Sequence, residues 1–288
     1  MTDEKKYTGW KRRYIRTLNG ITVVCIILGI FLNVGGWIGN DIFRTVTGFA
    51  GFGRGASRSS TEVTGGTLDR IDAFAKVEGE VGAGSVEFVT GKDYSCVYEN
   101  YPKDQTPEIS LDGTTLKIKQ KARNNRVVGD LKNSYSDAKI TISIPEKSAV
   151  DVDLELKLGT VKAKDVVFGD VELDADMGSI ELENCTAKDL DLTADMGAIE
   201  VTKCTFDGGK VEAKMGGIDL VGVVFDSAEA KADMGGLNVQ GTFNKFEAKC
   251  SMGGINVESE NEDAKLSLSS DMGGISVNGK SVGRSYNS

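Results

Sequence analysis

The carboxylates that recur at a fixed spacing are the first candidates for chemistry. Asp176 and Asp195 are separated by the same number of positions as Glu181 and Glu200. Carboxylates repeated in this way could share a divalent cation such as calcium, which prefers oxygen ligands. The alternative is a solvated acidic face whose row of charge is interrupted by Lys214. No loop offers the six or more oxygens that calcium takes, so the sequence favours the acidic face and predicts no metal site.

Sulfur side chains repeat with the same period. Cys185 and Cys204 are separated by the same interval as the carboxylates, and either a disulfide or a pair of buried thiols would suit them. The thiols are favoured, because neighbouring parallel strands give a disulfide poor geometry. Thioethers can bind copper, but in a chain without histidine the methionines are expected to fill the core at a corner. Every methionine after the first residue is followed by glycine, in the pairs Met177-Gly178, Met196-Gly197, Met215-Gly216, Met234-Gly235, Met252-Gly253 and Met272-Gly273.

The composition excludes several classes of site. The chain has 288 residues, no histidine, five cysteines and a formal net charge of −9. Without histidine there is no Ser-His-Asp or Cys-His catalytic group and no histidine-bound zinc. No glycine-rich loop followed by lysine and serine or threonine is present, so no phosphate-binding loop is expected. We therefore expect no catalytic residue, no cofactor and no small-molecule substrate, and the acidic balance disfavours nucleic acid as a partner.

The methionines mark a repeat that must position all of these side chains. Successive members of the set differ in residue number by 19, 19, 19, 18 and 20, and Leu158-Gly159 lies one period further upstream. Apolar and polar residues alternate up to each methionine, change phase across the glycine, and alternate again. Alternation with period two is typical of β-strands, and a change of phase at glycine indicates a corner. Aliphatic residues stand three positions after each methionine, at Ile180, Ile199, Ile218, Leu237, Ile255 and Ile275.

A coil of about 19 residues cannot bury its inner face alone, but coils stacked at the ~4.8 Å spacing of strands can. The sequence therefore predicts an all-β fold, a single-stranded parallel β-helix, wound right-handed as parallel crossovers almost always are. Residues 67–280 are expected to form this repeat domain and 281–288 a flexible tail. Before Asp151 the strand pattern is less regular, and 99–107 and 121–137 are expected to be polar loops.

The amino-terminal part has the features of a membrane anchor. Residues 1–20 carry six basic and two acidic side chains, and residues 21–38 carry no charge. Eighteen helical residues span about 27 Å, just enough to cross a hydrocarbon core. The excess of basic residues before this helix predicts a cytoplasmic amino end and an extracytoplasmic repeat domain. A retained anchor followed by a linker at 39–66 is favoured over a cleaved signal peptide, because Trp37 rather than an Ala-x-Ala-like site ends the apolar run.

One passage resembles a known family. A strand ending in Ile-Pro, followed by Val-x-Leu-x-Leu-x-Leu-Gly-x-Val, runs from Ile140 to Val161. Together with the recurring turns of glycine, a small residue, isoleucine, an acid and valine, it resembles the putative-adhesin β-strand-repeat family. The resemblance covers about Leu68 to Val277. This bacterial, envelope-associated domain of unknown function implies a right-handed β-helix, often behind a membrane anchor, and supplies no catalytic residue.

Three functional classes stay open. The repeats and the anchor fit a non-catalytic envelope protein that binds an unknown protein or the cell wall. An envelope-stress accessory or sensor would explain the basic tail equally well. A polysaccharide-acting enzyme is the least favoured, because it needs paired carboxylates in a cleft framed by long loops. We favour the first class and expect its partner contacts in a basic loop, at Lys121, Arg123, Arg126 and Lys132.

Overall fold

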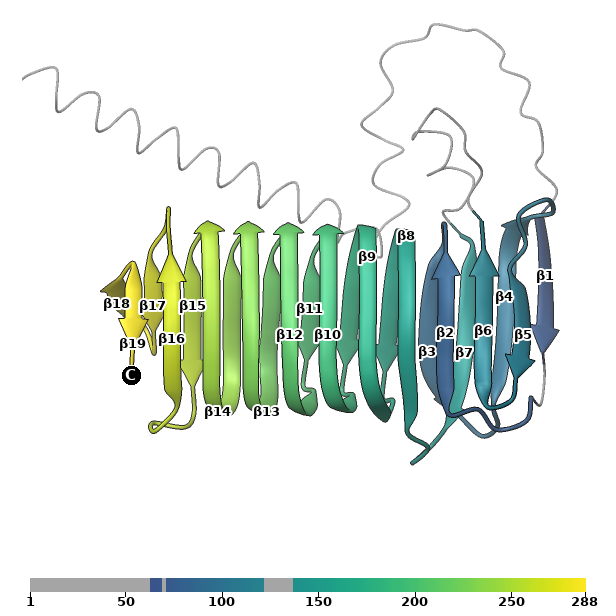
Figure 1. Cartoon of the computed structure of the whole chain (residues 1–288), viewed down its shortest axis with the longest axis horizontal. Coiled ribbons are helices and arrows are strands. Elements are labelled where there is room, and N and C mark those ends of the chain that lie inside the picture. The colour runs from purple at the N-terminus through teal and green to yellow at the C-terminus, as the bar shows by residue number, and fades with distance from the viewer. Residues whose placement is uncertain (1–62, 69–70, 122–136) are drawn as a thin grey trace, which may run out of the picture. The chain divides into compact units, whose positions relative to one another are not determined.

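The computed structural model describes residues 63–68, 71–121 and 137–288. They form a 19-stranded sheet that winds into a solenoid, with successive coils side by side (Figure 1). None of the described residues lies in a helix. The strands are β1 (Val63–Leu68), β2 (Lys76–Val81), β3 (Ser85–Gly91), β4 (Ser95–Pro102), β5 (Glu108–Asp112), β6 (Thr115–Gln120), β7 (Lys139–Pro145), β8 (Val150–Lys164), β9 (Phe168–Glu183), β10 (Thr186–Met196), β11 (Ile199–Thr202), β12 (Thr205–Met215), β13 (Ile218–Met234), β14 (Leu237–Met252), β15 (Ile255–Ser259), β16 (Lys265–Ser270), β17 (Ile275–Val277), β18 (Lys280–Gly283) and β19 (Ser285–Asn287).

Neighbouring coils pair in parallel with the register that the methionine spacing predicts. Met196 of β10 lies opposite Met215 of β12, and Ile199 of β11 lies opposite Ile218 of β13. Along β8 the side chains alternate between buried and accessible, as expected for strands with one face in a core. The prediction of an all-β parallel solenoid is therefore confirmed, while its winding sense stays a prediction.

The core consists of columns of like side chains from successive coils. Ile180, Ile199 and Ile218 are fully or almost fully buried. Ring columns add to them: stacked rings of Phe206, Phe225 and Phe243 have centroid separations of 5.1 and 4.7 Å. Burying one such side chain stabilises a fold by about 1.5–3 kcal/mol, so each coil adds its own share to a core that it forms only with its neighbours.

The coils from β8 to β13 have two corners of different construction. The methionine corner is the Met-Gly step that ends a long strand, for example between β12 and β13. The left-handed corner lies later in the coil, where one residue has positive φ. Its occupants are Asp165 (φ 58°), Asn184 (φ 53°), Lys203 (φ 55°) and Gly222 (φ 66°).

The upstream part differs from the predicted irregular coils. β2 and β3 do pair in parallel with β8. β4 instead pairs antiparallel with both β1 and β7, and β5 pairs antiparallel with β6. Residues 99–102, predicted as part of a loop, belong to β4, and Tyr101 there is fully buried.

The carboxyl end also differs from the sequence prediction. Residues 281–288 were expected to be a flexible tail, but β18 pairs antiparallel with β17 and β19 pairs antiparallel with β16. Ser288 Oγ donates a hydrogen bond to the Ala264 carbonyl and accepts one from the Leu266 amide. The tail is short and polar, so its pairing is a backbone effect that side-chain patterning does not reveal.

The predicted amino-terminal segments lie mostly outside the described residues. This holds for the basic tail at 1–20 and the apolar segment at 21–38. The predicted linker at 39–66 overlaps the beginning of β1. The described part of the chain contains no helix of the length and hydropathy that a membrane span requires.

Candidate functional site

The methionine column lies at the surface of the solenoid, which corrects the expectation that it fills the core. Met196, Met215, Met234 and Met252 have 42–44% of their surface exposed, and Met272 has 62%. Adjacent members are register partners from Met177 through Met252. We call Met177, Met196, Met215, Met234 and Met252 the thioether ladder. It is a continuous row of sulfur side chains along one edge of the coils, half-exposed from Met196 onward and less exposed at Met177.

The glycine that follows each methionine explains this exposure. A Cβ placed on Gly216 would lie 1.7 Å from the carbonyl oxygen of Gly197, and one on Gly197 would lie 1.7 Å from that of Gly178. The Gly197 amide donates to the carbonyl of Met215 at 3.1 Å. Backbones therefore stack directly at this corner. The last inward side chain before it is two residues earlier, as at Ala213, and the methionine itself is left on the outside.

One column of charged side chains runs along the strands that leave the methionine corner. In register, it contains Glu87, Lys162, Glu181, Glu200 and Asp219. Lys162 Nζ lies 2.7 Å from Glu181 Oε2. The column crosses an open groove of about 440 Å³ that is also lined by Lys164, Glu183 and Thr202. Opposite charges thus alternate at one end of the groove, while carboxylates follow one another at the other.

Glu200 is the carboxylate at which this repulsion concentrates. Partial burial, followed by the neighbouring charges of Glu181 and Asp219, raises the pKa of Glu200 above its ordinary value. On its other side Asp219 has a neutral neighbour, because its Oδ1 accepts a hydrogen bond from Asn238 Nδ2 at 2.7 Å. Glu200 therefore holds a proton more tightly than a free glutamate does.

The predicted carboxylate pairs are brought together as neighbours, but each has a lysine beside it. Glu181 is paired with Lys162, and Asp195 Oδ1 lies 2.5 Å from Lys214 Nζ. Within residues 63–68, 71–121 and 137–288, no three Asp, Glu or Cys side chains are grouped to hold a metal ion.

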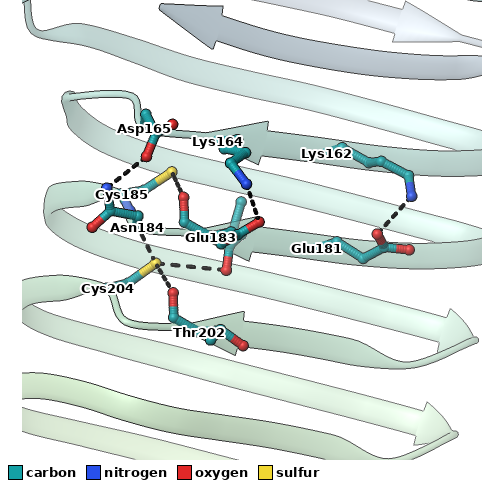
Figure 2. Close-up of polar contacts among 10 residues, drawn as sticks. Lys162, Lys164, Asp165, Glu181, Glu183, Asn184, Cys185, Thr202 and Cys204 are labelled. Carbon is teal, nitrogen blue, oxygen red and sulfur yellow. Dashed lines mark hydrogen bonds and ion pairs between the residues drawn. The ribbon is translucent and has the colours of Figure 1, made fainter.

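Cys185 and Cys204 lie one above the other beside the left-handed corner (Figure 2). Both are buried free thiols. The Cys185 amide donates to Cys204 Sγ at 3.3 Å, Cys185 Sγ donates to the Glu183 carbonyl at 3.3 Å, and Cys204 Sγ donates to the Thr202 carbonyl at 3.4 Å. These contacts match the thiol pair that the sequence favours over a disulfide.

The two thiols have different acidities. The hydrogen bond from Cys204 lowers the pKa of Cys185, although burial opposes it. The same contact with Cys185, followed by burial, raises the pKa of Cys204. Cys185 is therefore the thiol that ionises first, and Cys204 holds the remaining proton. Asp165 and Asn184 cover this corner, joined by an Asn184 Nδ2 to Asp165 Oδ1 hydrogen bond of 2.5 Å.

The outer face of β8, β9 and β10 is strongly acidic. Its columns are in register, so that Asp153, Glu172 and Asp191 follow one another across three coils. Lysines pair with some of its carboxylates: Lys76 Nζ lies 3.1 Å from Asp153 Oδ2, Lys157 Nζ lies 3.7 Å from Glu155 Oε1, and Lys188 Nζ lies 3.4 Å from Asp170 Oδ1. Asp195 is paired with Lys214. We call this surface the acidic face; its carboxylates are Asp151, Asp153, Glu155, Asp170, Glu172, Asp174, Asp176, Asp189, Asp191 and Asp195.

The same columns carry mixed charge on the later coils. On β12 and β13, Lys231 Nζ lies 2.8 Å from Glu212 Oε1, and Lys231 is also 3.3 Å from Asp233. On β14, Lys249 pairs with Glu247 at 2.7 Å. The strand geometry therefore accepts either pattern, and the concentration of carboxylates on three coils is a property of the sequence rather than of the fold.

Most of the residues predicted to contact a partner lie outside the described part of the chain. Lys121 is exposed at the end of β6. Arg123, Arg126 and Lys132 lie outside the described residues, so their role stays a prediction. Sequence reasoning recognised the repeated carboxylates at Asp176 and Asp195 but missed that they extend across β8, β9 and β10 as one face. A signal was present: aspartate or glutamate stands at every second position from Asp170 to Asp176, and the pattern largely recurs one period later.

Comparison with known proteins gives a family and a fold. No curated protein matches the chain. Among solved structures, a putative adhesin from Bacteroides fragilis matches with a TM-score of 0.57 at 15% identity, covering 76% of this chain and 97% of that one. A putative lipid binding protein from Parabacteroides distasonis matches with a TM-score of 0.45 at 15% identity, covering 77% and 96%. At this identity the first match shows a shared fold.

The family model described as Toastrack DUF4097 matches residues 79–287. The match spans most of the chain, including all the coils that carry the thioether ladder and the acidic face. It also agrees with the resemblance to an adhesin-like β-strand-repeat family that the sequence indicates. The chain therefore belongs to the Toastrack DUF4097 family.

Proposed function

We propose that this chain is a membrane-anchored, non-catalytic protein of the cell envelope whose extracytoplasmic solenoid binds another protein through the acidic face. The anchor and its orientation rest on the charge and hydropathy of residues 1–38. The description of the Bacteroides fragilis structure as a putative adhesin agrees with a binding role. A second, separate contact through the basic residues Lys121, Arg123, Arg126 and Lys132 is part of this proposal.

The observation that supports the proposal is that the acidic face lowers the stability of the solenoid through repulsion between its carboxylates. Like charges directly opposite each other on neighbouring strands destabilise a sheet, and β9 faces β10 with Glu172 beside Asp191 and Asp170 beside Asp189. The later coils show that the fold does not need this arrangement. The carboxylates of this face repel one another, yet the sequence retains them at regular positions on a rigid solenoid. Such a surface suits a partner with a complementary basic surface.

The test compares two variants with the same change of charge. The first carries Glu172→Gln, Asp174→Asn and Asp191→Asn on the acidic face. The control carries Glu229→Gln, Glu258→Gln and Glu262→Gln, which are exposed on later coils. Each variant also carries a photoreactive side chain at Thr193, which lies among the carboxylates of β10, and cross-linked products are measured in intact cells.

We expect the first variant to lose most of its cross-linked product and, because repulsion is relieved, to unfold at an equal or higher temperature. The control should keep its product. Equal cross-linking in both variants would contradict a role for the acidic face. Protease added to intact cells should degrade the solenoid, and its full protection would contradict the orientation. Release of glycan fragments by the purified chain, lost on Glu200→Gln, would replace the proposal with an enzyme.

A further inference from the structure

The thioether ladder has a chemical property that neither the fold nor the acidic face explains. Five methionines in register lie at the surface, on consecutive coils, each 42–44% exposed from Met196 onward. Exposed methionine is costly because it leaves apolar surface in water. A structural role would be met by any residue that tolerates the corner, and the fold itself contains such a case: Leu158 is the register partner of Met177.

The chemistry that separates methionine from leucine is its sulfur atom. A thioether is a soft, neutral ligand that selects soft metal ions such as Cu(I). It carries no proton in the relevant pH range, so a metal ion that binds to it does not compete with protonation, as it would at a thiol, imidazole or carboxylate. A site made only of thioethers is therefore distinguishable from every other site in the chain by its indifference to pH.

The spacing of the ladder suits such an ion. In-register parallel strands hold equivalent residues about 4.8 Å apart. Metal–sulfur bonds in proteins are about 2.3 Å long, so two sulfurs on opposite sides of one ion are separated by about 4.6 Å. Two methionines on neighbouring coils can thus hold one ion between them with little movement, and the unbranched side chain supplies the adjustment.

The carboxylates beside the ladder favour a cation at the end that contains Met177 and Met196. Asp176 and Asp195 directly precede Met177 and Met196, and Asp233 directly precedes Met234. Lys214 is the basic exception, and it is engaged with Asp195 at 2.5 Å. Cys250, one coil from Met234, is buried on the inner side and donates to the Gly235 carbonyl at 3.1 Å, so it does not face the ladder.

We infer that the thioether ladder is a binding site for Cu(I), in which each ion is held between methionines of neighbouring coils. Five rungs accommodate about two ions if each sulfur binds one ion. The inference is independent of the proposed partner contact, because the acidic face can be neutralised without touching a methionine.

The experiment uses Ag(I), a soft monovalent ion that needs no reductant, as the probe. The full-length chain is purified in detergent with methyl-labelled methionine, and binding is followed by titration calorimetry and by the methionine methyl resonances. Two variants with the same composition are compared. The alternating variant, Met196→Leu, Met234→Leu and Met272→Leu, leaves three isolated rungs, whereas the block variant, Met177→Leu, Met252→Leu and Met272→Leu, leaves Met196, Met215 and Met234 adjacent.

We expect the wild-type chain and the block variant to bind Ag(I) with shifts of the ladder methyl signals, and with affinity that changes less than about threefold between pH 7 and pH 5.5. The alternating variant should bind at least about tenfold more weakly, because a second ligand on the same surface acts at high effective concentration. Adding Leu158→Met to the alternating variant should restore binding, because position 158 is paired with Met177.

Equal affinity of the two variants would overturn the inference, since isolated thioethers or the thiols common to both would then account for binding. Methyl signals that do not move on saturation with Ag(I) would overturn it as well. Thermal unfolding of both variants verifies the fold, and the natural leucine at position 158 indicates that leucine is accepted in this column.

Discussion

The methionine corner and the left-handed corner both turn the chain from one strand of a coil to the next, but they do so with different residues. At the methionine corner, backbones of successive coils stack so closely that glycine recurs in every coil from Gly178 to Gly273. At the left-handed corner, the same reversal is made by one residue of positive φ, and aspartate, asparagine, lysine and glycine all occupy it. One corner is specified by contact between coils, the other by the conformation of a single residue.

This difference shows which repeats in a sequence report on the fold. The glycine column is constant because a Cβ has no room, whereas the left-handed corner varies because its cost falls on one residue and is modest. The methionine column is nearly as constant, with Leu158 before Gly159 as its exception, although its side chains are half-exposed from Met196 onward. A constant column without a steric reason is where a function of the surface should be sought.

The largest expected effect tests the steric reason. Gly216→Ala would place a Cβ 1.7 Å from the Gly197 carbonyl oxygen, and we expect it to lower the free energy of unfolding by about 3 kcal/mol or more, at the upper end of overpacking effects. Gly217→Ala is the matched control. Its nearest neighbour would be 3.5 Å away, and Ala198 occupies that column one coil earlier. Denaturant unfolding of both variants decides the matter, and similar losses would refute the contact.

A smaller effect is expected at the left-handed corner. A non-glycine residue in this conformation costs about 1–2 kcal/mol, partly offset because glycine gains about 0.4–1 kcal/mol of freedom in the unfolded chain. Lys203→Gly should therefore stabilise the chain by roughly 0.5–1 kcal/mol. Gly222→Ala should destabilise it by a similar amount without a steric clash, since the nearest atom would be 3.5 Å away. The measurement is again denaturant unfolding. The free energy of unfolding should rise in Lys203→Gly and fall in Gly222→Ala, and changes of the same sign would contradict the prediction.

The smallest effect concerns Glu200, which lies on the strand between the two corners. Its pKa is raised in the folded chain, so the folded state holds the proton more tightly than the unfolded state. Stability from this group is complete below the unfolded-state value near 4.5 and is lost as the pH rises through the higher folded-state value. Glu200→Gln should stabilise the chain at pH 7 by no more than about 0.5 kcal/mol, given solvent screening.

The same substitution should make little difference at pH 4, where the carboxyl is mostly protonated in both states. Thermal unfolding between pH 4 and pH 7 measures this, with Glu258→Gln as the exposed control. A greater gain for Glu200→Gln at pH 4 than at pH 7 would contradict the sign of the shift.

The sequence predicted the solenoid because its strongest signals are local and repeated. Spacing alone placed Ile199 beside Ile218, and the structure confirms it. It also brought Cys185 and Cys204 together as thiols. The methionine column was misplaced for a physical reason: at a corner, two consecutive residues such as Asp195 and Met196 face outward, and a period-two pattern assigns an apolar residue to the core.

Other differences arise where pairing depends on the backbone. Among the antiparallel strands, β5 carries the same alternation as the parallel strands, while β1 and β4 carry little alternation, so residue types do not indicate the direction of pairing. The acidic face spans coils that are one repeat apart in the sequence, and its meaning appears only when the columns are compared with the mixed charges of β12, β13 and β14. The local residue pattern is enough to predict a single coil, whereas the surface charge pattern can be recognised only when neighbouring coils are aligned.

The antiparallel strands at the carboxyl end have a consequence for self-association. A stack of parallel coils would end in a row of unpaired amides and carbonyls, which is a template for another copy to add its own strands. Here β19 covers β16 and β18 covers β17 with chain running the opposite way. The edges of β16 and β17 are therefore already paired and do not offer a parallel template to a second solenoid. The short polar tail thus covers strand edges that a purely parallel stack would leave open.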